Sequence, residues 1–547
     1  MSTPMDKACD VLIVGGGPTG LMLACQLARF GISYRIVEKN SGPTTQSRAL
    51  AIQARSLELF AQMGIAQKAV EQGKHAKAVN YVARGKLAQR ISLEGHGQAL
   101  TAFPYLLILD QSRTEQLLID FLAQHDHTVE WQTELVSLTE NSHSVLATLK
   151  HADGTHERVQ AAWLVGADGA KSAVRRILDI PFGGKTYQYS LFVLDCKVDL
   201  PFKDDEGYIA FSDTSFAAFF PMTEGRCRVI SMLPQELSDK EQITFGDVAH
   251  GFAERMQMDV KLSDPKWLSV YQSHHRYVST FRQGRCFLAG DAAHIHSPVG
   301  AQGMNTGLQD AHNLAWKLAM VMSGQAGRNV LETYNQERLP IARSLVRTTD
   351  RVFNLTLNTN PVARFWMMYV APKALALVLN EKHLARFAFT TISQIGIRYR
   401  TSSLSRDASL GTFPRHAPQP GDRLPYVVFH EQGKQVNIQD KLKAPAFHLF
   451  VFPGTQTETK AQALQYAADR FDGAIVVETI PLTAASKPLY EKLGVQHGGC
   501  YLVRPDMYIA YRSAAWNTEH FAHYLERFLI KAEQHQKSSV ERVRIGV

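Results

Sequence analysis

The sequence has few cysteines and no cysteine spacing that suits a metal or a redox pair. Six cysteines lie far apart between Cys9 and Cys500 in a chain of 547 residues, and none belongs to a CxxC. This pattern excludes a disulfide framework or a zinc site and is typical of reduced thiols in the cytosol. The first residues also lack a basic segment followed by an apolar one. We therefore predict no secretory signal and a cytoplasmic protein.

Dense charge runs and long uninterrupted apolar runs are also missing. The formal net charge is +8, but lysine and arginine are scattered along the chain. This distribution argues against a nucleic-acid partner and fits an anionic small molecule. The most apolar late segment, residues 361–379, contains Arg364, Lys373 and two prolines. Because charges inside a membrane are costly, we predict a core or interface helix here and no membrane span.

The first strong motif is a glycine-rich turn between an apolar run, residues 11–14, and a helical pattern, residues 21–30. A second apolar run, residues 34–37, leads to Glu38. Strand, GxGxxG turn, helix, strand and acid together predict a dinucleotide-binding unit. In such a unit the helix N-terminus faces the phosphates and the acid accepts from ribose hydroxyls. The predicted cofactor contacts in this unit are Gly15, Gly17, Pro18, Thr19, Gly20, Glu38 and Lys39.

Two later segments have the same form, an apolar strand that ends in small residues and an acid. "WLVGADG" ends with Asp168 and precedes a helix that carries Arg175, and "CFLAGD" ends with Asp291. We predict a helix after Asp291, from about Thr306 to Met322. Because ligands of open α/β sheets gather at the carboxyl ends of strands, we expect the three strand ends to form one site in one sheet. The glycine-rich turn alone leaves FAD and NAD as alternatives.

Taken together, the three motifs resemble those of the class A flavoprotein monooxygenases. These are single-component FAD-dependent aromatic hydroxylases, and the resemblance is to the phenol, pentachlorophenol and polyketide hydroxylase branch. The GxGxxG at Gly15, the DG motif at Asp168 and the GD motif at Asp291 follow the family order across roughly residues 8–350. The resemblance implies an α/β fold with a Rossmann-like FAD-binding domain, an inserted antiparallel β-sheet substrate domain and a C-terminal thioredoxin-like α/β domain.

Changes of pattern along the chain predict where these domains lie. Apolar residues alternate with polar ones between about 181 and 275, as in antiparallel strands. From Pro418, short apolar strands alternate with helical stretches, and the last predicted helix runs from about Thr518 to Ala532. The last region has Cys500 but no CxxC, so a structural or dimerisation role is favoured over redox exchange, which is compatible with a homodimer. The predicted domains are 1–180 with 276–350 for FAD, 181–275 for the substrate sheet, 351–417 for a helical connection and 418–547 for the C-terminal domain.

The resemblance also implies roles for single residues in cofactor binding. Asp291 would bind the FAD ribityl chain, and Gln111 would hydrogen-bond the polar part of the cofactor. Arg48 would neutralise the pyrophosphate or lie beside the mobile flavin, while Asp168 would serve both FAD and the nicotinamide cofactor. Arg175 is a candidate for the reductant's phosphates, with a solvated helix arginine as the alternative. The main-chain amides expected to lie against the isoalloxazine and pyrophosphate belong to Gly303, Met304 and Asn305.

The substrate pocket is predicted from one loop and one strand. His296 and Pro298 follow the GD motif, while Phe216, Phe220 and Pro221 lie on an alternating strand, with plain core packing as the alternative. His294 and His296 form an HxH, but alternation points them in different directions and no third ligand stands nearby, so we predict no metal site. The catalytic base is not identified by the sequence.

The implied reaction leaves the difficult chemistry to the flavin. NADH or NADPH reduces FAD, dioxygen gives a flavin hydroperoxide, and one oxygen atom passes to an electron-rich carbon of a phenol or related aromatic. No second GxGxxG occurs, and the resemblance implies transient nicotinamide binding. Two alternatives stay open. One is a flavin monooxygenase acting on a polycyclic antibiotic or a non-aromatic alkene, and the other is a non-catalytic FAD-binding redox module.

Overall fold

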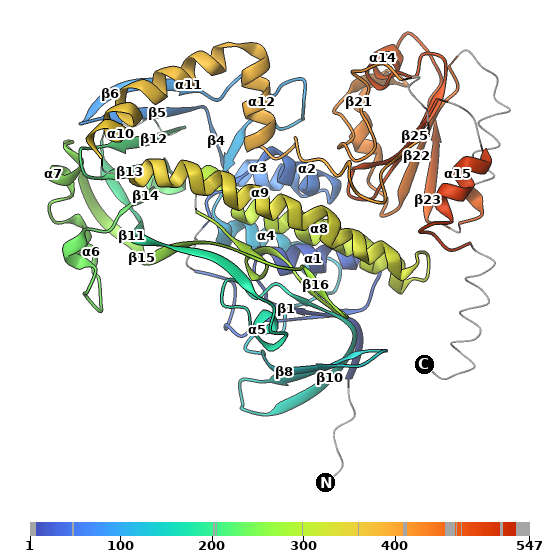
Figure 1. The fold of residues 1–547 in the computed structure, drawn as a ribbon, viewed down its shortest axis with the longest axis horizontal. Coiled ribbons are helices and arrows are strands. Elements are labelled where there is room, and N and C mark those ends of the chain that lie inside the picture. Colours follow the sequence, from blue (N-terminus) through green and yellow to red (C-terminus); the bar gives the residue numbers. More distant parts are fainter. Residues whose placement is uncertain are drawn as a thin grey trace.

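Two large sheets joined by long helices, and a smaller third sheet, make up the molecule (Figure 1). The structure is a computed structural model. It describes residues 7–531 apart from 46–48, 201, 202, 204, 298, 359, 409–412, 455–464, 466, 467, 472 and 515–517. Two predicted site residues, Arg48 and Pro298, therefore lie outside the described residues.

The first sheet has seven strands and brings the three sequence motifs to one edge. Its central path runs β16-β17-β10-β1-β2, in which β17, β10, β1 and β2 are parallel, and β9 and β8 extend it by antiparallel pairing. Val14 is opposite Gly166, and Gly166 is opposite Leu288. The predicted meeting of the three strand ends is thus confirmed. The strands are β1 (Lys7–Val14), β2 (Tyr34–Val37), β8 (Glu134–Glu140), β9 (Val145–Lys150), β10 (His156–Gly166), β16 (Arg282–Gln283) and β17 (Cys286–Leu288).

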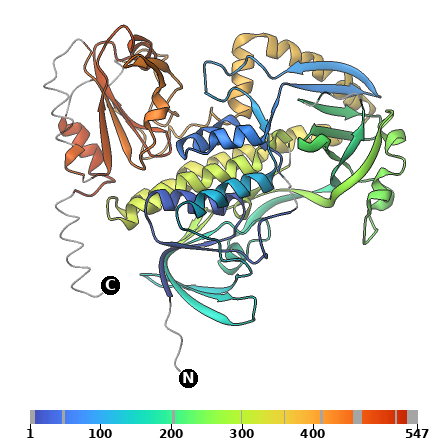
Figure 2. The ribbon, with the colours of Figure 1, turned by 180° about the vertical axis from the view of Figure 1, so that it is seen from behind.

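Helices cover this sheet and carry the motif loops. The first begins at Pro18, three residues before the predicted helical pattern, because proline's fixed φ suits the first turn of a helix. The helix predicted from Thr306 begins earlier, at Gly303. Helix α1 packs against α4 and α8, and the view from behind shows the N-terminal blue helix beside α8 (Figure 2). The helices are α1 (Pro18–Arg29), α2 (Ala54–Gln62), α3 (Ala66–Gln72), α4 (Gln111–Ala123), α5 (Ala173–Ile177), α8 (Gly303–Met322) and α9 (Glu332–Leu357).

The second sheet has eight strands in the order β18-β15-β11-β14-β13-β12-β5-β6. The predicted antiparallel strands form its middle, but β5 and β6 come from the range assigned to the FAD-binding domain, and β5 pairs with β12 in parallel. Two short helices, α6 (Phe245–Ala249) and α7 (Phe252–Met256), precede β15. A separate three-stranded sheet joins β3 (Ala51–Ile52), β7 (Leu106–Ile108) and β4 (Lys74–Ala76). The strands of the second sheet are β5 (Ala78–Ala83), β6 (Lys86–Ser92), β11 (Phe182–Asp199), β12 (Glu206–Phe211), β13 (Phe216–Pro221), β14 (Cys227–Met232), β15 (Lys261–Val278) and β18 (His294–Ile295).

A helical cap, residues 361–392, lies across β5 and β6 (Figure 1). It consists of α10 (Pro361–Phe365), a π-helical turn η6 (Trp366–Val370), α11 (Ala371–Asn380) and α12 (Lys382–Ile392). Within the described part of the chain, the stretch Pro361–Asn380 is long and apolar enough to cross a membrane, yet only 22% of its most apolar window is buried. The expectation of a core helix is therefore wrong, and the interface helix stays a prediction.

The C-terminal region is an α/β unit around a five-stranded mixed sheet, in the order β19-β25-β24-β22-β23. The last helix, predicted to reach Ala532, ends at Leu525. Cys500 is buried in β24, and burial raises the pKa of its thiol to about 12, so the thiolate needed for redox exchange is not formed at neutral pH. The elements are β19 (Arg406–Asp407), β20 (Val428–Glu431), β21 (Lys434–Asn437), β22 (Phe447–Phe452), β23 (Ile475–Thr479), α14 (Lys487–Leu493), β24 (Gly499–Val503), β25 (Ile509–Ser513) and α15 (Thr518–Leu525).

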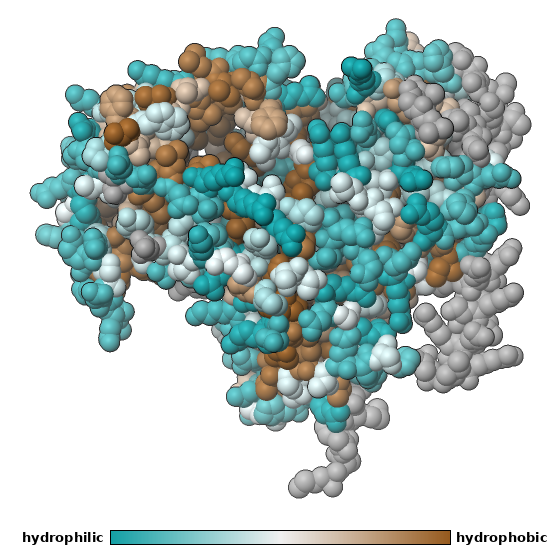
Figure 3. Space-filling view, viewed as in Figure 1, coloured by the Kyte–Doolittle hydropathy of each residue, from teal (hydrophilic) through white to brown (hydrophobic). Residues whose placement is uncertain are grey.

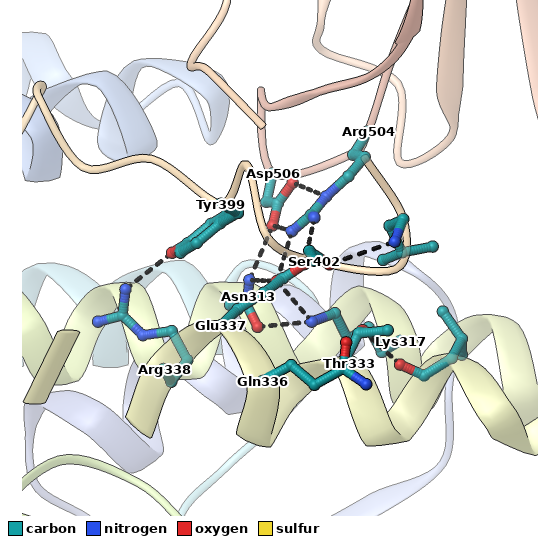
Figure 4. A network of polar contacts seen from close by, with 12 residues as sticks. Asn313, Lys317, Thr333, Gln336, Glu337, Arg338, Tyr399, Ser402, Arg504 and Asp506 are labelled. Atoms are coloured by element: carbon teal, nitrogen blue, oxygen red, sulfur yellow. Dashed lines mark hydrogen bonds and ion pairs between the residues drawn. The ribbon is translucent and has the colours of Figure 1, made fainter. Parts of the chain in front are cut away.

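A buried ionic network joins this unit to helices α8 and α9 (Figure 4). Arg504, between β24 and β25, donates to Glu337 of α9 at 2.6 Å and also pairs with Asp506. Lys317 of α8 approaches the same Glu337 at 2.8 Å, and Asn313 donates to both Glu337 and Asp506. Burial alone would raise the pKa of Glu337, but the cations of Arg504 and Lys317 hold that pKa below its usual range. The burial of Glu337 and Asp506 as charged carboxylates is therefore stable only with these cations and donors in place.

We predict that Arg504→Met strongly destabilises the protein. The substitution leaves Glu337 and Asp506 buried with fewer compensating donors, and breaking a buried ion pair from one side costs about 3–5 kcal/mol. Arg400→Met is the matched control, because Arg400 pairs with Asp422 at 2.8 Å on the surface, where a pair contributes about 0–1 kcal/mol. Thermal and urea unfolding of the two variants measure the difference. Equal losses would show that the network does not hold the domains together.

Candidate functional site

A cavity of about 1410 Å³ lies between the two large sheets and the helical cap. Its wall includes the glycine-rich turn, the DG and GD motifs, strands of the second sheet and residues of α11 and α12. The predicted site residues that line it are Gly15, Gly17, Pro18, Thr19, Glu38, Lys39, Gln111, Phe220, Asp168, Asp291, His296, Gly303 and Met304.

The glycine-rich turn is shaped for close approach of a ligand. Gly15 has φ +115°, and a Cβ there would lie 2.3 Å from the carbonyl oxygen of Ala167. A Cβ on Gly17 would meet nothing within 4 Å, so this glycine faces open space. Gly20 does not line the cavity, and a Cβ there would lie 1.9 Å from the Gly15 carbonyl oxygen. Gly15 and Gly20 thus serve close packing of the turn against β10 and the helix, while Gly17 leaves open space on the ligand side.

Glu38 stands at the end of β2 beside this turn. Its Oε2 accepts from the Gly16 amide at 2.8 Å, and its Oε1 accepts from the Asn40 amide at 3.0 Å. The carboxylate is therefore fixed against the glycine loop while the side chain still lines the cavity. Trp131, which the sequence did not single out, lines the same end and lies 3.3 Å from a Cβ built on Gly16.

The two motif aspartates divide their oxygens between fold and cavity. Asp168 Oδ2 accepts from the Ala173 and Val174 amides at 2.6 and 3.2 Å and so caps α5. Its Oδ1 is buried and has no hydrogen-bond partner among the described residues. A buried carboxylate oxygen without a donor is costly, so a ligand hydroxyl at this wall would satisfy it. Asp291 lies on the cavity wall with an exposed side chain.

The GD loop is held from behind by a buried carboxylate, Asp310 of α8. Its Oδ2 accepts from the Gly290 amide at 3.0 Å and lies 2.7 Å from His294 Nε2, while its Oδ1 accepts from Arg338 at 2.6 Å. Burial would raise the pKa of Asp310, but the charges of Arg338 and His294 lower it. His294 thus supports the loop, and it turns away from His296, as alternation along the loop predicted.

The loop before α8 presents main chain to the cavity. Gly300 and Ala301 both have positive φ, +76° and +51°, so Ala301 holds a left-handed conformation that glycine adopts more easily. Asn305 does not line the cavity. Its Oδ1 accepts from the Gln53 amide at 2.8 Å, and its Nδ2 donates to the carbonyl of Ala51. The asparagine side chain therefore ties α8 to the segment before α2.

The far end of the cavity is mostly apolar. It is formed by the second sheet and by the cap, whereas Pro221 does not line it and Phe216 packs in a core with Phe211 and Phe353. The core-packing alternative therefore holds for Phe216. The apolar lining residues at this end are Val79, Tyr81, Ile91, Leu93, Ile209, Phe220, Ile230, Leu375, Leu379, Phe389 and Ile392.

A few polar groups stand within this apolar end. His296 Nδ1 lies 2.7 Å from the Ser297 carbonyl, which can only accept, so Nδ1 carries the proton. Its Nε2 is then an acceptor, buried and without a partner among the described residues. Burial lowers the pKa of His296 to about 4, which keeps the ring neutral. Arg228 also lines the cavity and is paired with buried Asp195 at 2.7 Å.

Neither sequence-based interpretation of Arg175 is correct. Its side chain is buried, donates to the Ala292 carbonyl at 2.8 Å and lies 3.8 Å over the Phe182 ring. The neighbouring Arg176 lines the cavity in its place. The five-residue helix α5 is too short for periodicity to reveal which arginine faces which way.

Comparisons with known proteins agree with this site. A family model described as "FAD binding domain" matches residues 8–349, and one described as "Aromatic-ring hydroxylase, C-terminal" matches residues 417–532. The 6-methylpretetramide 4-monooxygenase of Streptomyces rimosus is 32% identical over 515 residues, which cover 92% of this chain and 90% of that protein. Pentachlorophenol 4-monooxygenase of Sphingobium chlorophenolicum is 32% identical over 460 residues, 82% of this chain and 80% of that protein. The solved structure of the anhydrotetracycline hydroxylase OxyS from Streptomyces rimosus superposes with a TM-score of 0.76 at 27% identity, covering 93% of this chain and 96% of that one.

We predict that Asp291→Ala weakens FAD retention about tenfold or more. The substitution removes an acceptor for ligand hydroxyls and leaves them unpaired, at a cost of about 1–3 kcal/mol. Flavin absorbance after dilution and gel filtration measures the bound fraction. Asp259→Ala, at an exposed position away from the cavity, is the control. Equal flavin content in the two variants would contradict the role of Asp291.

We also predict that His296 contributes to acid destabilisation. Its folded pKa of about 4 lies below the usual 6.5, so the unfolded chain binds the proton more readily, and stability falls as the pH drops from about 6.5 towards 4. His296→Gln should therefore lose less stability over this interval than the wild type. Melting temperatures across that pH range measure the effect. His143→Gln, on an exposed turn, should follow the wild type, and parallel curves for all three proteins would contradict the prediction.

Proposed function

Since the chain belongs to the aromatic-ring hydroxylase family of FAD-dependent monooxygenases, we propose that it hydroxylates a phenol or another electron-rich aromatic with NAD(P)H and dioxygen. Its relatives act, by their names, on pentachlorophenol and on 6-methylpretetramide. The enzyme is a flavin-dependent aromatic monooxygenase with FAD as its cofactor, and NAD(P)H is typical of the family. The observation that carries the proposal is the single cavity that runs from a glycine-rich phosphate-binding turn to an apolar chamber.

The residues of the polar end fit FAD. The turn leaves open space at Gly17 for a pyrophosphate at the N-terminus of α1, where the helix dipole favours negative charge. Asp168 offers a buried oxygen without a donor, and Asp291 offers a second carboxylate on the same wall. Glu38 is placed to accept from ribose hydroxyls. Bound FAD supplies electron transfer from NAD(P)H and activation of dioxygen.

The residues of the apolar end position the substrate and exclude water. Phe220, Ile230 and Phe389 give flat or branched apolar surfaces against which an aromatic ring packs. Gly303 and Met304 border this end with main chain at the start of α8. Water exclusion protects reactive oxygen species from side reactions. Neutral His296 is a candidate acceptor for a phenolic hydroxyl.

A polycyclic aromatic is a second candidate substrate, supported by the relative whose name is anhydrotetracycline hydroxylase. Sites for a single small ligand are about 300–1,000 Å³, whereas this cavity has about 1410 Å³. The cavity therefore has room for a cofactor and a substrate together, and a polycyclic antibiotic belongs to the class of the second candidate. Arg48 and Pro298 keep their predicted roles as proposals, as do the four domain ranges, a cytoplasmic location and a homodimer.

The test is oxidation of NADH or NADPH by the FAD-loaded protein with a panel of phenols and polycyclic phenols. We expect one group to accelerate NAD(P)H consumption and to yield a product with one added oxygen atom. Mass spectrometry of the product distinguishes hydroxylation from uncoupled oxidation. No acceleration by any aromatic would favour an alkene substrate or a non-catalytic redox module.

We further predict that substrate controls reduction. NAD(P)H has to reach the cavity although no second dinucleotide motif is present, and water has later to be excluded from the same space. A substrate that binds one arrangement of the cavity better than the other shifts their populations. Stopped-flow flavin reduction with the best-bound phenol should be about tenfold faster than without it, which is about 1.4 kcal/mol of barrier. Equal rates would refute substrate control.

A further inference from the structure

The outer face of the helical cap exposes an unusual number of large apolar side chains. Figure 3 shows them gathered at the upper left, over α11. The opposite side of the cap is held by protein, since Met367 and Met368 pack with Phe211 and Phe353 in a core cluster. The exposed fractions are 78% for Val362, 72% for Leu377, 70% for Phe387, 59% for Phe365, 49% for Ile392, 47% for Leu384 and 44% for Trp366.

Such a concentration of exposed apolar surface marks a binding face. Scattered exposed apolar residues need no explanation, but a contiguous patch costs free energy in water unless a partner covers it. The exposed apolar residues lie on α10, η6, α11 and α12, which follow one another in the chain. The cap is also anchored on one side, and the chain turns between Asn380 and Lys382, so that α12 runs at an angle to α11 (Figure 1). It is therefore built to lie on a surface and does not cross one.

The charges around this face are mainly positive. Lys373, Lys382 and Arg386 are exposed on the cap, and Glu381 is the acidic residue between them. Lys492 of the C-terminal unit adds a further positive charge near Arg386. Burial lowers the pKa of Lys492, and the neighbouring charge of Arg386 lowers it further. Arg364 is buried over the Phe211 ring and belongs to the inner side. An apolar face that carries a half-exposed Trp366 and is bordered by lysine and arginine has the chemistry of a helix in the interface of an anionic lipid layer.

The cap also borders the cavity, since Leu375 and Ile392 line it. A lipid layer on the outer face would cover the exposed apolar side chains there. An apolar aromatic molecule dissolved in the acyl region would then lie beside the helices that wall the chamber.

We propose that the helical cap docks the protein on an anionic lipid surface through its exposed apolar face. The docking rests on the exposed face and its charges. The delivery of an aromatic from the lipid additionally rests on the proposed function. The two parts are separated by measuring lipid binding directly and by measuring FAD content and NAD(P)H oxidation on the same samples.

The experiment is flotation of the full-length FAD-loaded protein with vesicles. Equimolar phosphatidylcholine and phosphatidylglycerol vesicles should carry the protein upwards at low salt, and vesicles of phosphatidylcholine alone should carry much less. The double variant Leu377→Glu with Phe387→Glu should lose about tenfold of the binding, because charges replace the two most exposed side chains of α11 and α12. Lys382→Glu with Arg386→Glu should lose the preference for phosphatidylglycerol.

Val136→Glu is the matched control, since Val136 is 47% exposed on β8, away from the cap. It should bind vesicles as the wild type does, and neither Leu377 nor Phe387 lines the cavity, so FAD content should be normal in every variant. Flotation of wild type no greater than without vesicles would overturn the proposal. A concentration-dependent dimer in analytical ultracentrifugation that the Leu377→Glu, Phe387→Glu variant abolishes, without vesicle binding, would assign the face to a second copy and also overturn it.

Discussion

The position of the cofactor loop depends on one buried carboxylate, Asp310. It receives the Gly290 amide and His294 from the loop and Arg338 from α9, so a single side chain fixes the strand end, the loop and two helices together. An unpaired carboxylate would be too costly to bury at this position, so Asp310 needs the hydrogen bonds and charges of all three partners. Asp291, next to Gly290, lines the cavity.

The same two helices carry the contact with the C-terminal unit. Arg338 donates to Tyr399 as well as to Asp310, and the adjacent Glu337 receives Arg504 and Lys317. No residue beyond Ser393, in the part of the chain that the structure describes, lines the cavity. The C-terminal unit therefore supports α8 and α9 from the side opposite the ligand. The contact is made through buried charge, and the raised pKa of Cys500 argues against redox exchange in this unit.

The polar end and the apolar end of the cavity are built by different parts of the chain. Its polar end is made by strand ends of the parallel sheet, where main-chain amides and three carboxylates converge. Its apolar end is made by the broad faces of the second sheet and by the cap, which supply mostly apolar side chains, with Arg228 of β14 as a charged exception. The cap contributes to this chamber with one face and presents a second apolar face to the outside.

The sequence by itself determined the α/β class, the three motif loops and the convergence of Asp168, Asp291 and the glycine-rich turn, because each is a local strand-to-loop pattern and parallel strands align their ends. Tertiary structure alone decided that β5 and β6 complete the second sheet, that Arg176 and not Arg175 reaches the cavity, and that Asn305 is a structural tie. It also decided that the apolar segment after Pro361 is exposed. These outcomes depend on contacts between residues far apart in the chain, and local periodicity records only which faces are apolar, not what each face meets.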